Sequence, residues 1–151
     1  MLADKNKNVR YTKMTKSFDD LLAKVSECSK KTVAVACAQD DAVLEAVKAA
    51  KERGIADAIL VGNEAEIKTI ARTLKMHIDD YKIINVEDPI EAARTAVKLV
   101  HDGEADMYMK GLIDTKSFLK SVLDKEVGLR TDKTLSHVCV FEIKGVDHLL
   151  F

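Results

Sequence analysis

Short apolar segments alternate with amphipathic helical segments along most of the chain, and this alternation constrains the fold more than any other feature. The apolar segments are rich in β-branched residues and have the length of buried strands. They lie at 32–36, 58–61, 82–86 and 106–109. Strands that alternate with helices through short loops form a parallel sheet with helices on both faces. We therefore predict an α/β fold with a three-layer αβα, mostly parallel, Rossmann-like sheet.

Residues that cap helices stand shortly after these strands. Asn63 precedes a glutamate by three residues, which is the spacing of a capping box. Asp88 precedes a proline that can occupy the first position of a helix. Asp114 or Thr115 begins another helix, and an amphipathic pattern predicts a first helix over 17–28. These signals predict where the helices start.

Ligands of such sheets bind beyond the carboxyl ends of the strands. Gly62, Lys110 and Gly111 stand at these ends in the predicted sheet. A lysine supplies a positive charge, and a glycine lets the backbone approach a ligand closely. Arg130 follows in a loop that contains glycine, and a guanidinium can bind two oxygens of one phosphate. Together with free backbone N–H groups at the start of a helix, these residues predict a site for phosphate or a carboxylate.

The pattern changes after residue 124. A polar loop over 125–134 leads into 135–143, where polar and apolar residues nearly alternate as in a strand. Lys144 and Gly145 then predict a tight turn into an apolar run, and the two apolar segments indicate a β-hairpin. Natural domains seldom end inside such a run, so we expect a truncated second domain. The predicted parts are a disordered leader or cloning scar, an α/β domain and the start of that second domain, at 1–13, 14–134 and 135–151.

Composition and charge exclude several classes of function. Hydrophobic residues make up 47% and charged residues 32% of the chain, as in a soluble globular protein. The net charge of -1 disfavours broad nucleic-acid binding, which needs a concentrated positive surface. Because no apolar run could span a bilayer and no signal peptide is recognisable, we expect no membrane association and a cytoplasmic location. Cys139 lies among apolar residues and is predicted to be a core residue rather than a nucleophile.

Three segments of the second half carry a resemblance to a known family. They are MKGLIDT at 109–115, EVGLRT at 126–131 and LSHVCVFEI at 135–143. In these segments the chain resembles the phosphate acetyltransferase/butyryltransferase family, and the LSHV form is more similar to the butyryl branch. The resemblance runs from about residue 14 to residue 151 and covers roughly half of the length of a family member.

The resemblance implies reversible transfer of a short acyl group between coenzyme A and inorganic phosphate, in a cleft between two α/β domains of a homo-oligomer. The substrates would be acyl-CoA and inorganic phosphate, with no metal and no further cofactor. It implies that Lys110, Gly111, Thr115, Arg130 and Ser136 line the phosphate or acyl-phosphate side of this cleft. The catalytic base stays unassigned. Further catalytic groups would belong to the second half of the protein, so we expect this chain to be inactive alone.

Two alternatives remain open at this point. One is phosphate acetyltransferase activity, because the acyl-chain preference depends on a pocket that the motifs do not define. The other is a non-catalytic module that binds a phosphorylated ligand, or a receiver-like regulatory domain. Asp40 and Asp41 after the first strand are similar to the acidic pair of receivers, but no aspartate ends a central strand as a phospho-acceptor. A receiver would bind magnesium, whereas a transferase fragment would respond to phosphate or coenzyme A.

Overall fold

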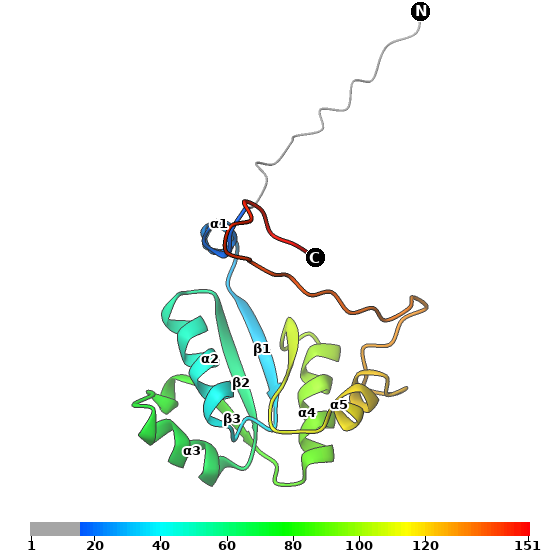
Figure 1. Cartoon of the computed structure of the whole chain (residues 1–151). Helices are drawn as coiled ribbons and strands as arrows, with labels where there is room; N and C mark the ends of the chain where they lie inside the picture. Colours follow the sequence, from blue (N-terminus) through cyan, green and yellow to red (C-terminus); the bar gives the residue numbers. More distant parts are fainter. Residues whose placement is uncertain (1–15) are drawn as a thin grey trace, which may run out of the picture. The chain divides into compact units, whose positions relative to one another are not determined.

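The computed structural model describes residues 16–151, which form two compact units (Figure 1). The larger unit spans Cys28–Leu135. The smaller unit joins the described residues up to Glu27 with Ser136–Phe151. The predicted leader over 1–13 lies outside the described residues.

The larger unit is built on a four-stranded parallel sheet in the order β3-β2-β1-β4. Its strands are β1 (Lys31–Ala36), β2 (Ala56–Gly62), β3 (Lys82–Asn85) and β4 (Met107–Lys110). All four match predicted segments. Because the strands are parallel, their carboxyl ends share one edge, which we call the carboxyl edge. The order of the strands reverses between β1 and β4, and crevices for ligands form at such points.

A helix follows each strand, and the helices after β2, β3 and β4 begin where the capping residues predict. They are α2 (Asp41–Glu52), α3 (Glu64–Thr73), α4 (Pro89–His101) and α5 (Thr115–Val122), with a short 3₁₀ helix, η1 (Ile78–Asp80), that was not predicted. The side chains of Asp40, Asn63, Asp88 and Asp114 each accept hydrogen bonds from backbone N–H groups of the first turn. These bonds satisfy donors that have no partner inside the helix, which is why these residues start the helices.

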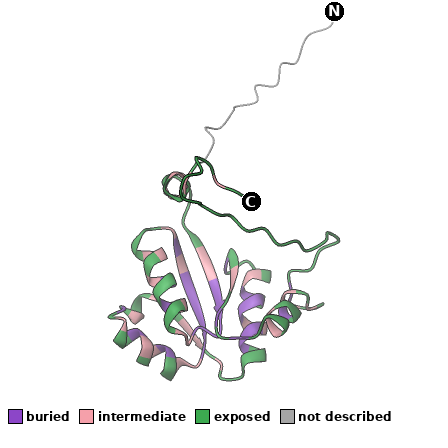
Figure 2. Cartoon of the chain, viewed as in Figure 1, coloured by how far each residue is buried: buried purple, intermediate pink, exposed green. Residues whose placement is uncertain are grey.

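Two apolar clusters hold the layers together, one on each face of the sheet (Figure 2). On one face, Ala92, Ala93 and Ala96 of α4 pack against Ala34 and Ala36 of β1, where the small side chains let helix and strand lie close. On the other face, α2 and α3 cover the sheet with larger side chains. The largest fully buried residues of that cluster are Val35, Leu44, Leu60 and Ile67. The three-layer αβα prediction is therefore confirmed.

The smaller unit contains α1 (Phe18–Val25), which is capped by Ser17 and buries none of its residues. The segment over 136–151 forms a turn at Lys144 and Gly145 and a single antiparallel bridge between Phe141 and Leu150. The predicted strand over 135–143 does not form, and the β-hairpin is not confirmed. A physical reason is that an isolated two-stranded hairpin is marginally stable without further strands or a helix to pack on.

Apolar side chains of this segment therefore stay exposed. Val138 is 70% and Phe151 94% exposed. Cys139 is exposed as well, so the prediction that it is a core residue is wrong for this chain. That 135–151 opens a second domain stays a prediction.

Candidate functional site

The carboxyl ends of β1 and β4 are held together by their backbones. The N–H of Gly111 donates to the carbonyl oxygen of Ala36 at 2.9 Å, and the N–H of Leu112 donates to that of Cys37 at 2.8 Å. A Cβ atom on Gly111 would lie 2.3 Å from the Cys37 oxygen and 2.5 Å from the Ala36 oxygen, so only glycine fits. Both N–H groups are consumed by the strand ends. They are not free for an anion, so an anion at this edge would have to use other groups.

Cys37 is the first residue after β1 and has a left-handed backbone with φ 54. Such a conformation is uncommon for a residue other than glycine and marks a constrained turn. Its side chain is buried, and Sγ lies 3.6 Å from the carbonyl oxygen of Pro89. Burial raises the pKa of the Cys37 thiol, the charge of Asp88 adds to this, and Lys110 opposes it. The thiol is therefore protonated near neutral pH and fills a structural role.

Lys110 supplies the positive charge of the carboxyl edge. It is exposed, and its Nζ donates only a long hydrogen bond of 3.4 Å to the carbonyl oxygen of Gly111. Among residues 16–151 its ammonium group has no carboxylate partner. An ammonium on a flexible stem without a partner can bind a phosphate as a point charge.

Thr115 is exposed at the first position of α5, directly after the edge. The preceding Asp114 caps this helix and accepts a hydrogen bond of 2.9 Å from the N–H of Ser117. Hydrogen bonds from Ser117 lower the pKa of the Asp114 carboxyl, so it is ionised near neutral pH. The start of α5 thus carries the negative charge of Asp114, which disfavours an anion there. Lys110 is the group of this edge whose charge favours binding of an anion.

Gln39 is a polar residue of this edge that the sequence did not single out. It is half-buried, and its Oε1 is buried without a hydrogen-bond partner among the described residues. A Cβ atom on Gly62 would lie 2.2 Å from this oxygen, so the glycine at the end of β2 makes room for the amide. A single glutamine in a loop carries no pattern, and no sequence signal could have found it.

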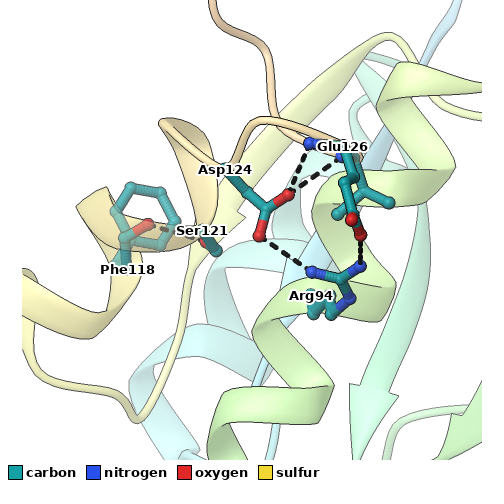
Figure 3. Close-up of polar contacts among 6 residues, drawn as sticks. Arg94, Phe118, Ser121, Asp124 and Glu126 are labelled. Atoms are coloured by element: carbon teal, nitrogen blue, oxygen red, sulfur yellow. Dashed lines mark hydrogen bonds and ion pairs between the residues drawn. The ribbon is translucent and has the colours of Figure 1, made fainter.

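A second polar centre lies along α4, where Arg94 binds the turn that follows α5 (Figure 3). Its Nη1 donates to Asp124 Oδ2 at 2.8 Å, and its Nη2 donates to Glu126 Oε2 at 2.6 Å. The other oxygen of Asp124 accepts from the N–H groups of Glu126 at 2.8 Å and Val127 at 3.0 Å. Those N–H groups, and next Arg94, lower the pKa of the Asp124 carboxyl. We call residues 124–129 the tethered turn.

Arg130 follows the tethered turn directly. The carbonyl oxygen of Gly128 lies 3.0 Å from His101 Nδ1, and the N–H of Leu129 donates to the oxygen of Val122 at 2.8 Å. The α4 helix begins at the carboxyl edge and runs about 18 Å to His101, its last residue. The chain therefore reaches Arg130 near the end of α4 that lies away from the carboxyl edge.

The four predicted site residues of the larger unit are consequently not gathered in one place. Lys110, Gly111 and Thr115 lie together at the carboxyl edge, whereas Arg130 follows a turn that is bound to the opposite end of α4. Arg130 is exposed and has no hydrogen-bond or ion-pair partner among residues 16–151, so its guanidinium is available to a ligand. Ser136 is exposed and belongs to the smaller unit, and its role stays a prediction.

The chain matches the phosphate acetyl/butaryl transferase family over residues 17–95 and 89–151. It belongs to this family. The match includes every residue of the carboxyl edge and the tethered turn. No helix within residues 16–151 is long and apolar enough to cross a membrane. In the same part of the chain, no group of three or more His, Cys, Asp and Glu residues is arranged to hold a metal ion.

Curated relatives of this family member include phosphate butyryltransferases of two clostridia. The protein of Clostridium beijerinckii is 55% identical over 138 residues, which are 91% of this chain and 46% of the relative. That of Clostridium acetobutylicum is 56% identical with the same coverage. A phosphate acetyltransferase of Thermotoga maritima is 40% identical over 83% of this chain and 42% of its own length. The chain thus spans about half the length of the curated relatives it matches.

Solved structures of phosphotransacylases share the fold. A branched-chain phosphotransacylase from Enterococcus faecalis V583 superimposes with a TM-score of 0.50 at 26% identity, over 62% of this chain and 33% of that one. A phosphotransacetylase from Streptococcus pyogenes superimposes with a TM-score of 0.60 at 19% identity, over 71% of this chain and 42% of that one. The second likeness supports the fold alone.

Proposed function

We propose that the complete protein transfers a butyryl group reversibly between coenzyme A and inorganic phosphate. The observation that carries this proposal is the identity of 55% to a phosphate butyryltransferase over 91% of the chain. The phosphate acetyltransferase of Thermotoga maritima is more distant at 40%, which favours butyryl over acetyl as the acyl group. Membership of the family argues against the receiver-like alternative.

The reaction exchanges a thiolate and a phosphate on one carbonyl carbon. A phosphate oxygen forms a bond to that carbon, the C–S bond breaks, and the electron pair leaves on sulfur. Phosphate must therefore lose part of its hydration shell while it stays negatively charged. A cation at the site stabilises that charge and lowers the activation free energy of the transfer. At the carboxyl edge we assign this role to Lys110, with Thr115 providing a hydroxyl, while Gly111 joins the end of β4 to β1 and so holds Lys110 in place.

Arg130 supplies a second positive charge at a different place. Coenzyme A carries phosphate groups of its own, so the two substrates together present more than one anion. A guanidinium without a protein partner suits such a group because it can bind two phosphate oxygens at once. We assign Arg130 to a phosphate group of either substrate. The hydroxyl of Ser136 and homo-oligomer formation are further parts of the proposal, as is the absence of a metal.

Phosphate-dependent release of thiol from butyryl-CoA tests the proposed function. We expect release by the complete protein and none by the chain of residues 1–151, because the chain covers only 46% of the relatives' length. Acetyl-CoA serves as the matched substrate and should react more slowly. Release by the short chain would show that its own residues suffice for catalysis. A folded complete protein that releases thiol from neither ester would contradict the proposal.

A further inference from the structure

Most of the tethered turn lies in the segment predicted as a polar loop, yet two helices of the larger unit, α4 and α5, bind it. Arg94 and His101 of α4 hold its side chains and its backbone, and Val122 of α5 holds its last residue. The glycine of the turn is buried, and a Cβ atom on Gly128 would lie 2.4 Å from the oxygen of Asp124. The backbone of the turn therefore packs closely against itself at Gly128, two residues before Arg130.

An exposed ion pair usually contributes little to stability, and that is the simplest reading of Arg94. Its side chain is 38% exposed, that of Asp124 27% and that of Glu126 78%. The geometry differs from that of an isolated pair. One guanidinium bridges two carboxylates of a single turn, and the more buried carboxylate also accepts the N–H groups of that turn. Networks of this kind fix a conformation even where they add little to overall stability.

We propose that Arg94 is a positioning residue for Arg130, which it places by fixing the tethered turn through Asp124 and Glu126. Arg130 then binds a phosphate group, either inorganic phosphate or a phosphate of coenzyme A. This inference rests on the proposed function. A long side chain binds an anion well only when its base is fixed, because an unfixed base must be ordered at the moment of binding. The turn provides that base, and Arg94 couples it to the rigid α4 helix.

The test is a double-mutant cycle in the complete enzyme with Arg94→Gln and Arg130→Gln. The KM for inorganic phosphate and the KM for butyryl-CoA are measured separately, together with kcat. Calorimetric binding of inorganic phosphate and of coenzyme A supplies a readout that needs no turnover. We expect Arg130→Gln to weaken one of the two ligands at least about tenfold, because it removes a charged hydrogen bond. Arg94→Gln should weaken the same ligand about two- to fivefold.

In the Arg130→Gln background, Arg94→Gln should cause no further loss of ligand affinity, because Arg94 acts through the side chain of Arg130, which is then absent. Arg94→Lys keeps a charge but cannot bridge both carboxylates, so it should recover only part of the loss. Lys98→Gln is the matched control. Lys98 also lies on α4 and pairs with Asp102 of the same helix, and within residues 16–151 no hydrogen bond or ion pair joins its side chain to the turn. It should leave both KM values unchanged.

Equal losses from Arg94→Gln with and without Arg130 would show a merely structural role and overturn the inference. So would an effect of Lys98→Gln as large as that of Arg94→Gln. If Arg130→Gln changes neither KM nor binding in an active enzyme, the inference falls while the acyl-transfer function stands. If the wild-type enzyme shows no turnover, the proposed function fails, and calorimetry with the two ligands still decides on Arg94 and Arg130.

Discussion

At the scale of single residues, the carboxyl edge combines an ammonium group that has no carboxylate partner within residues 16–151 with a glycine whose backbone contacts leave no room for a side chain. Lys110 carries the charge, and Gly111 makes the contacts with the end of β1. The two neighbours thus act in different ways. Replacing the lysine should change the affinity for phosphate, whereas replacing the glycine should change the stability of the fold.

Lys110→Ala in the complete enzyme should raise the KM for inorganic phosphate about tenfold or more, because a charged hydrogen bond to the substrate is lost. Steady-state kinetics with varied phosphate measures this. Lys120→Ala, which removes a lysine from the last turn of α5, is the control and should leave the KM for phosphate unchanged. An unchanged KM in Lys110→Ala would remove this lysine from the phosphate site.

Gly111→Ala should lower the free energy of unfolding by about 1–3 kcal/mol or more, because the new methyl group overlaps two backbone oxygens that cannot rotate away. Urea denaturation followed by circular dichroism measures the loss. Gly54→Asn is a useful comparison, since Gly54 has φ 68 and open space around it, and asparagine tolerates that conformation. Equal stability of Gly111→Ala and wild type would contradict the close contact between β1 and β4.

At the scale of elements, Tyr108 joins β4 to both helices of its face. Its hydroxyl donates to the oxygen of Ala93 on α4 at 3.2 Å and lies 2.9 Å from Ser121 Oγ on α5. Its ring stacks on Phe118 with centroids 4.5 Å apart. Burial raises the pKa of Tyr108 to about 12, and the hydrogen bond between Tyr108 and Ser121 opposes this shift. The packing of α5 thus depends on a tyrosine that stays protonated.

This raised pKa predicts a loss of stability in alkali. Between the unfolded pKa of about 10 and the folded value of about 12, the unfolded chain loses the proton of Tyr108 while the folded chain keeps it. The free energy of unfolding should therefore fall as the pH rises through this window. Tyr108→Phe should show a shallower fall in urea denaturation at several pH values. The same slope in both proteins would contradict the buried hydroxyl.

At the scale of the whole molecule, the larger unit holds the complete sheet and both apolar clusters. The α1 helix of the smaller unit buries none of its residues. The stability of the chain should therefore reside in the larger unit, and the smaller one should add little.

A fragment of residues 28–135 should fold by itself and unfold in one cooperative transition. We expect its urea midpoint to be close to that of the chain of residues 1–151. Circular dichroism and the cooperativity of the transition measure this. A fragment without a cooperative transition would show that the smaller unit is needed for the fold.

Local sequence chemistry determined the strands and the helix starts of this protein. Strand periodicity and caps such as Asn63 and Asp88 act between neighbours in the chain, so a reader of the sequence can find them. The same holds for Lys110 and Gly111 at a strand end. The family likewise follows from short motifs, which are a local property.

Only the tertiary structure decided which of the predicted site residues lie close to one another. The N–H groups that follow β4 donate hydrogen bonds to carbonyl oxygens at the end of β1. The turn before Arg130 is bound to α4. The alternating pattern over 135–143 forms no strand, because a strand needs a partner that the pattern does not specify. Each outcome depends on contacts between residues far apart in the chain. Local preferences carry no information about such contacts, and only the packed sheet supplies it.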